Sequence, residues 1–341
     1  MRQKAAPGEQ ELPCAQPGWI RKKDVRTMLE VPVYMITGFL ESGKTTFIQN
    51  VLESPDFADG EKTLLLLCEE GEVEYDEKEY SRHNIEIMTV ESEEDLNLEF
   101  LERCQKYYKP YRVFVEFNGM WDAKKFIEGK LPRHWEVYQV ITLVDASTFG
   151  VYLTNMRSIL SNIFAYTELV IFNRCSLEMD LQMYRRSVKA VNQQAMLSFE
   201  DVDGNPLELG KEQPPYDLNA EVIEIDDVDY GIWYLDMADT PERYDGKTVR
   251  FKGKVMKPRK FPENCFIPGR NAMTCCANDI RFIGYICKSK FTEKLKQKQW
   301  LEVTAEVKYE YMPEYGGEGP VLYTKHLKSA EPPAEDLVYF N

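Results

Sequence analysis

The sequence has no apolar run long enough to cross a lipid bilayer, and its first residues, Met-Arg-Gln-Lys, lack the apolar core of a targeting segment. We therefore expect a cytoplasmic protein without a membrane span. Basic residues are in deficit, with 42 Lys and Arg against 57 Asp and Glu and a formal net charge of −15. Because an acidic surface repels phosphate backbones, this balance argues against nucleic acid as a partner. The eight cysteines are scattered, which is typical of reduced thiols rather than of a disulfide framework.

The length of the chain favours two domains. With 341 residues, of which 43% are hydrophobic, it exceeds the usual size of a single core. Residues 1–30 mix Pro, Gly, Gln and charged residues without apolar periodicity, which predicts a flexible extension. Residues 198–227 are rich in turn-forming residues and predict a linker. These breaks leave a first domain at residues 31–197 and a second at residues 228–341.

The first domain alternates short apolar runs with helical patterns. Helical periodicity is clearest at residues 93–108 and 177–192. The alternation predicts an α/β fold in which helices flank a parallel sheet. Six apolar runs suit strands that are buried on both faces: residues 33–37, 63–68, 85–90, 111–117, 137–145 and 169–173.

The second domain shows strand signals bounded by Gly and Pro. They lie at residues 248–255, 282–287, 300–309 and 321–326. The pattern Gly-Lys-x-Val-x-Phe-x-Gly, followed by a long excursion and Trp-x-x-Val, is typical of an OB-like barrel. We therefore expect a small, mainly antiparallel β-barrel.

Residues 38–45, Gly-Phe-Leu-Glu-Ser-Gly-Lys-Thr, satisfy the full spacing of a phosphate-binding P-loop, with a predicted strand before them and a helix after. In such a loop, backbone N–H groups and the dipole of the following helix bind phosphate oxygens. Lys44 would reach the β and γ phosphates, and the Thr45 hydroxyl would bind Mg²⁺. The predicted nucleotide-binding residues of the loop are Gly38, Glu41, Ser42, Gly43, Lys44, Thr45 and Thr46.

This part of the chain resembles the CobW-like family of P-loop GTPases, relatives of the nickel chaperones UreG and HypB, whose loop usually reads Gly-Phe-Leu-Gly-Ser-Gly-Lys-Thr-Thr. Residues 69–76, Glu-Glu-Gly-Glu-Val-Glu-Tyr-Asp, are similar to the family segment Asn-Glu-Phe-Gly-Glu-Val-Gly-Ile-Asp, and residues 115–119 are similar to its Glu-x-x-Gly segment. The resemblance implies a Mg²⁺-dependent GTP-binding protein with slow GTPase activity, ATP being the alternative nucleotide. It also implies a metallochaperone role, for zinc or cobalt, toward a client metalloprotein.

Three further residues are candidates beside the loop. Glu116 ends a predicted strand, where the carboxyl edge of a parallel sheet faces the nucleotide, so it would position Mg²⁺ or water and act with Lys44 in catalysis. Asp76 is a second candidate Mg²⁺ ligand, in an acidic stretch that could equally be a solvated loop. Asn173 begins Asn-Arg-Cys-Ser, the counterpart of the family's Asn-Lys-x-Asp, and is expected to bind the nucleotide.

Departures from the family pattern leave a second interpretation open. Glu41 stands where glycine is usual, and Ser176 replaces the Asp that accepts hydrogen bonds from guanine. The metal-binding Cys-x-Cys-Cys element is absent between Asp76 and Glu116. The alternative to an active GTPase is therefore a degenerate nucleotide-binding scaffold or sensor that hydrolyses little and acts through its C-terminal barrel.

The last hundred residues resemble the soluble C-terminal domain of YcgQ-like permease-associated proteins. The segments that carry this likeness are residues 244–253, 273–277, 300–304 and 331–333. Cys275 and Cys276, with Cys265 and Cys287 in the same domain, could supply thiolates to zinc. Adjacent cysteines on a strand point to opposite sides, so unligated thiols are the alternative.

Overall fold

The computed structural model describes residue 20 and residues 30–69, 71, 75–210, 212–274 and 279–340. The chain divides into two compact units, one formed by residues 1–181 and 194–209 and the other by residues 182–193 and 210–341. Each unit has its own sheet and its own hydrophobic core. Within the described ranges, no helix is both long enough and apolar enough to cross a bilayer.

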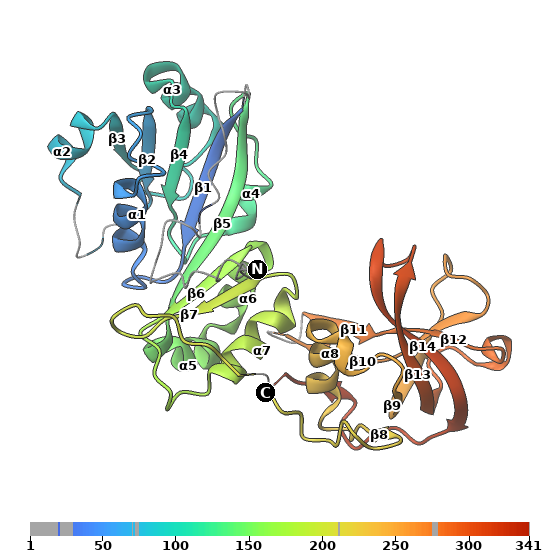
Figure 1. Ribbon diagram of the computed structural model, residues 1–341. Coiled ribbons are helices and arrows are strands. Elements are labelled where there is room, and N and C mark those ends of the chain that lie inside the picture. Colours follow the sequence, from blue (N-terminus) through green and yellow to red (C-terminus); the bar gives the residue numbers. More distant parts are fainter. Residues whose placement is uncertain are drawn as a thin grey trace, which may run out of the picture. The chain divides into compact units, whose positions relative to one another are not determined.

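The first unit is built on a seven-stranded sheet with the strand order β3-β2-β4-β1-β5-β6-β7 (Figure 1). Every neighbouring pair of strands runs parallel. The predicted α/β fold with a parallel sheet is therefore confirmed. The strands are β1 (Val31–Thr37), β2 (Thr63–Leu67), β3 (Ile85–Thr89), β4 (Arg112–Glu116), β5 (Trp135–Asp145), β6 (Leu169–Asn173) and β7 (Met196–Phe199).

Helices cover both faces of this sheet because successive strand residues point to opposite sides. Ile36 of β1 lies in one hydrophobic cluster with Phe47 of α1. Its neighbour Met35 lies in a different cluster, with Leu101 of α3. The helices of this unit are α1 (Lys44–Glu53), α2 (Glu77–Arg82), α3 (Leu98–Tyr108), α4 (Ala123–Ile127), α5 (Ala146–Asn155) and α6 (Arg157–Tyr166).

Two helices begin later than the sequence predicts. α3 starts at Leu98 instead of residue 93, because the Asn97 side chain caps it by accepting a hydrogen bond from the Phe100 N–H at 3.0 Å. α7 (Leu181–Val191) starts at residue 181 instead of 177, because the Ser176 carbonyl accepts a hydrogen bond from the Met179 N–H in a turn at 3.1 Å. A side-chain cap thus marks the start of α3, and a backbone turn precedes α7.

The second unit contains a closed ring of five strands, β9-β10-β12-β14-β13, in which β13 pairs back with β9. Every pair in this ring is antiparallel except β12–β14, which is parallel. The predicted OB-like barrel is therefore confirmed, with one parallel pair. The elements are β8 (Ile223–Glu224), α8 (Tyr230–Asp239), η3 (Pro241–Arg243), β9 (Thr248–Met256), β10 (Cys265–Met273), β11 (Ile280–Gly284), β12 (Ile286–Lys288), η4 (Thr292–Lys294), β13 (Trp300–Met312), β14 (Gly317–Ser329) and β15 (Leu337–Val338).

Helix α8 packs on the barrel through aromatic side chains. Trp233 of α8 is fully buried, and its ring centroid lies 4.7 Å from that of Phe251 in β9. The greater part of α7 also belongs to this unit, and its Arg185 forms an ion pair with Asp239 of α8 at 2.7 Å. The barrel core thus extends onto a helical layer.

Candidate functional site

The loop between β1 and α1 begins and ends with glycines in backbone conformations that other residues rarely adopt. Gly38 has a φ of 139° and Gly43 a φ of 94°. A Cβ atom on Gly38 would lie 2.2 Å from the carbonyl oxygen of Leu143 in β5. The glycine spacing therefore lets the loop pack on β5 and places it at the N-terminus of α1, the geometry that a phosphate-binding site requires.

Lys44, the first residue of α1, folds back over this loop. Its Nζ donates hydrogen bonds to the carbonyl oxygens of Gly38, at 2.9 Å, and Phe39, at 2.8 Å. It also forms an ion pair with the carboxylate of Glu69, which follows β2. Both side chains are largely buried, so the ammonium group lies inside the site rather than in solvent.

Glu116, the last residue of β4, comes together with Thr45 as the sequence predicts. The Thr45 hydroxyl donates a hydrogen bond to Glu116 Oε1 at 2.5 Å, and the Tyr75 hydroxyl donates one to Glu116 Oε2 at 2.7 Å. The Glu116 side chain is buried. These contacts follow from the strand order, because β4 lies next to β1 and brings its carboxyl end to the loop.

Two further groups of the site, Glu69 and Tyr75, are not predicted from the sequence. Burial raises the pKa of the Glu69 carboxyl above its ordinary value of 4.5, although the charge of Lys44 opposes this change. Burial, and then the neighbouring Glu116 carboxylate, raise the pKa of Tyr75 far above its ordinary value, so its hydroxyl stays a hydrogen-bond donor. The only signal was their place in the acidic stretch at residues 69–76, which also fits a solvated loop.

Asn173, at the end of β6, holds the loop from the other side. Its Nδ2 donates a hydrogen bond to the carbonyl oxygen of Ser42 at 2.8 Å. Its Oδ1 is buried and has no hydrogen-bond partner within the described residues. A Cβ atom on Gly43 would lie 3.0 Å from that Nδ2, so Asn173 packs directly on the loop. These contacts give Asn173 a role in holding the loop, and its nucleotide-binding role stays a prediction.

Arg174 adds a second connection, which is not predicted from the sequence. Its Nη1 donates a hydrogen bond to the carbonyl oxygen of Glu41 at 3.1 Å and pairs with the carboxylate of Asp145 at 2.5 Å. Burial opposes ionisation of Asp145, but hydrogen bonds from Ser147 and Arg174 outweigh it and lower its pKa below 3.8. Arg174 thereby links the loop to the end of β5.

Glu41 occupies the position where the family that this chain resembles usually has glycine. The backbone conformation at this position is one that glycine adopts more readily than other residues. Glu41 has a φ of 62°, in the left-handed region, where a side chain costs about 1–2 kcal/mol. The residue is exposed. The chain thus carries a strained residue at this point of the loop, and Glu41 is among the residues that line the cavity beside Lys44 and Thr45.

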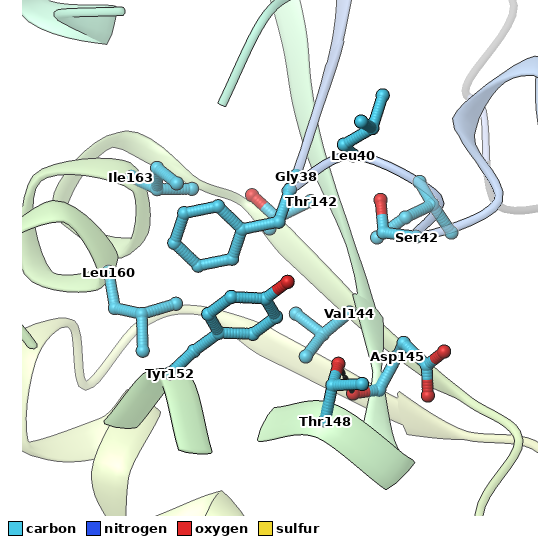
Figure 2. Close-up of a pocket in the computed structure, with 12 residues that line it drawn as sticks. Gly38, Leu40, Ser42, Thr142, Val144, Asp145, Thr148, Tyr152, Leu160 and Ile163 are labelled. Atoms are coloured by element: carbon cyan, nitrogen blue, oxygen red, sulfur yellow. Dashed lines mark hydrogen bonds between the residues drawn. The ribbon is translucent and has the colours of Figure 1, made fainter. Parts of the chain in front are cut away.

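Cavities lie on both sides of the loop. One, of about 130 Å³, is lined by Lys44, Thr45, Glu69 and Glu116 among other residues. The other has a volume of about 10 Å³, room for one water molecule at most. Figure 2 shows it, with Ser42 and Asp145 on one side and Leu160 and Ile163 on the opposite side. The first cavity is therefore the one that has room for phosphate groups.

The structure places Asp76 away from this cavity. Its carboxylate caps α2 by accepting hydrogen bonds from the N–H groups of Lys78, at 3.1 Å, and Glu79, at 3.2 Å. It lines a different cavity, together with Tyr80 and other residues of that region. Capping explains an acidic residue here without a metal, and the Mg²⁺ role of Asp76 stays a prediction.

The predicted zinc ligands Cys275 and Cys276 lie outside the described residues. Cys265 and Cys287 are buried, and burial raises the pKa of the Cys287 thiol to about 12. The Cys287 Sγ lies 3.2 Å from the Thr324 hydroxyl. Among the described residues there is no cluster of three or more His, Cys, Asp or Glu that could hold a metal ion.

Two family models match parts of this chain. Residues 32–198 match the family model CobW/HypB/UreG, nucleotide-binding domain, and residues 208–340 match the DUF1980 C-terminal domain. No curated protein gives a significant match.

The chain is also similar to solved structures. One is the hydrogenase maturation factor HypB from Archaeoglobus fulgidus, at 18% identity over 51% of this chain and 82% of that chain, with a TM-score of 0.38. Another is the Zn(II)-bound YjiA GTPase from E. coli, at 18% identity over 70% of this chain and 86% of that chain, with a TM-score of 0.40. At this identity and TM-score, neither likeness carries an argument about function.

The family matches and the observed folds assign each part of the chain. The match at residues 32–198 includes the loop, Glu116 and Asn173, and that segment forms the parallel sheet described above. The match at residues 208–340 includes the whole five-stranded barrel. The resemblance identified in the sequence is thus confirmed for both parts, and the chain combines a nucleotide-binding domain of the CobW/HypB/UreG family with a DUF1980 C-terminal domain.

Proposed function

We propose that this protein is a Mg²⁺-dependent GTP-binding protein with slow GTPase activity, acting as a cytoplasmic metallochaperone that supplies zinc or cobalt to a client metalloprotein. The observation that carries the proposal is the convergence of Lys44, Thr45 and Glu116 at the phosphate loop. The match to the CobW/HypB/UreG nucleotide-binding domain supports it, and the metal cargo rests on the family resemblance alone.

In this proposal each side chain at the loop has a separate role. Lys44 stabilises negative charge on the β and γ phosphates from within a buried site, where its charge is poorly screened. The Thr45 hydroxyl and the Glu116 carboxylate, 2.5 Å apart, offer the hard oxygen donors that Mg²⁺ prefers. The ion would supply charge neutralisation at the phosphates. Asn173 holds the loop in place through its hydrogen bond to the Ser42 carbonyl.

The direct test is a titration of labelled GTP and ATP with and without Mg²⁺, followed by a phosphate-release assay. We expect Mg²⁺-dependent binding by the wild type and a loss of affinity of about 10- to 100-fold in Lys44→Ala, because a charge-assisted contact with phosphate is lost. Lys62→Ala is the matched control, since Lys62 is an exposed lysine of the same unit. Equal binding and equal phosphate release by wild type and Lys44→Ala would refute the proposal.

A second candidate function is a nucleotide-binding scaffold or sensor that acts through the C-terminal barrel and hydrolyses little. The strained, charged Glu41 in the loop and Ser176 in place of the guanine-binding Asp favour it. This function predicts nucleotide binding without turnover. Hydrolysis that depends on Lys44 would exclude it.

A further inference from the structure

Every hydrogen of the Lys44 ammonium group already has an oxygen partner inside the chain. A lysine ammonium has three hydrogens to donate. In this structure, they face the carbonyl oxygens of Gly38 and Phe39 and the carboxylate of Glu69. A phosphate oxygen can therefore reach Lys44 only by replacing one of these partners.

Glu69 is the partner that a phosphate would replace. The Gly38 and Phe39 carbonyls belong to the loop itself, whose backbone is fixed by its packing on β5. Glu69 is instead a side-chain anion, and it lines the cavity that has room for phosphate groups. Only 9% of its side chain is exposed, against 2% for Lys44, so solvent screens this pair poorly.

The Glu69 carboxylate depends on Lys44 for its counter-charge. Burial opposes ionisation of Glu69, and Lys44 is the group that offsets this effect. If Lys44 turned to a phosphate, Glu69 would face both the loss of its counter-charge and repulsion by the nucleotide.

We propose that Glu69 is an internal anion that occupies the phosphate site and that nucleotide binding displaces it from Lys44. This inference rests on the phosphate-binding function proposed above and adds a residue that sets nucleotide preference. Because Lys44 serves the β and γ phosphates, a triphosphate places more negative charge beside Glu69 than a diphosphate does. Glu69 therefore weakens the binding of the triphosphate more than that of the diphosphate.

Two described residues that follow Glu69 lie near the Mg²⁺ ligands of the proposed function. Gly71 lies beside Thr45, since a Cβ atom on Gly71 would be 3.7 Å from the Thr45 hydroxyl. The Tyr75 hydroxyl donates a hydrogen bond to Glu116. Glu69 is therefore close along the chain to residues that contact Thr45 and Glu116.

The test compares wild type with Glu69→Gln, which keeps the shape of the side chain and removes its charge. Dissociation constants for labelled GTP and GDP are measured with Mg²⁺ in the full-length protein, and thermal unfolding confirms that each variant is folded. We expect Glu69→Gln to bind GTP at least about tenfold more tightly, since a charged competitor becomes a neutral one, and to bind GDP with a smaller gain. Glu86→Gln, at an exposed position of β3, is the matched control and should leave both constants unchanged.

Each outcome decides the inference. Equal GTP affinity of wild type and Glu69→Gln, with binding intact, would overturn the role of Glu69 and leave the phosphate-site function standing. Weaker GTP binding by Glu69→Gln would also overturn it, because Glu69 would then assist the nucleotide. Absence of nucleotide binding by both proteins would contradict the phosphate-site function itself and, with it, this inference. If Glu69→Gln unfolds early, Glu69→Ala takes its place with the same expected gain.

Discussion

Replacement of Gly119 by alanine tests whether the phosphate loop is held in place by close backbone packing. Gly119 follows β4, and an added Cβ atom would lie 2.4 Å from the carbonyl oxygen of Gly38, 2.6 Å from its carbonyl carbon and 3.1 Å from the Phe39 nitrogen. These neighbours are backbone atoms that cannot rotate away, so the strand end or the loop must shift. Such overpacking costs about 1–3 kcal/mol. A domain of this size loses about 2–4 °C of Tm per kcal/mol, so we expect Tm to fall by about 2–12 °C.

The same substitution should weaken nucleotide binding, because Gly38 opens the loop and its carbonyl accepts a hydrogen bond from Lys44. Thermal unfolding and GTP titration measure the two effects on one variant. Gly150→Ala is the matched control: Gly150 lies within α5, nothing lies within 4 Å of its added Cβ, and a gain of about 0.4–1 kcal/mol is expected. A Gly119→Ala protein with the Tm and the GTP affinity of wild type would refute the packing argument.

Other predictions concern stability, pH and metal content. Arg112→Met should lower the free energy of unfolding, measured in urea, by about 3–5 kcal/mol. The substitution removes the ion-pair partner of Asp59 and the hydrogen bond that the Phe57 carbonyl accepts. The hydrogen bonds that Asp145 accepts outweigh its burial and lower its pKa. The difference in unfolding free energy between wild type and Asp145→Asn should therefore be constant from about pH 7 to 5 and shrink below about pH 4. If the barrel binds zinc, Cys275→Ser and Cys276→Ser should each reduce the zinc content of protein purified under reducing conditions. Unchanged metal content would exclude both residues as ligands.

The sequence predicts the position of the loop, because its glycine spacing is fixed along the chain, but it does not predict the contributions of Glu69, Tyr75 and Arg174 to the site. Lys44 and Thr45 lie at the start of a helix that follows a strand, as the glycine spacing requires. Glu116 could be placed because parallel strands end at the same edge of a sheet. Contacts such as Arg174 with Asp145 depend on the strand order, which places β6 beside β5, and no local pattern encodes that order.

The barrel contains a strand that the sequence pattern does not predict. Strand β10 was not predicted, because Pro268 and Gly269 read as turn residues. In the structure, a Cβ atom on Gly269 would lie 2.2 Å from the carbonyl oxygen of Ile283 in β11. Gly269 therefore marks a close approach between β10 and β11, and the glycine belongs to the strand. The pairing of β10 with β11, which lies outside the closed ring, creates this requirement.

Base choice is the property of the site that one substitution can decide. Ser176 is exposed and follows Asn173 at the spacing where the family has Asp. Ser176→Asp would restore an anionic acceptor for the guanine N1–H and 2-amino group, donors that adenine does not present on that edge. Hydrogen bonds to charged groups are worth about 1.5–3 kcal/mol, so the preference for GTP over ATP should rise about 10- to 100-fold in competition titrations. Ser176→Asn, of the same size but uncharged, should give a smaller rise. A ratio that stays at the wild-type value in Ser176→Asp, with nucleotide affinity intact, would mean that the base does not lie beside Ser176, and that Asn173 serves the loop rather than the base.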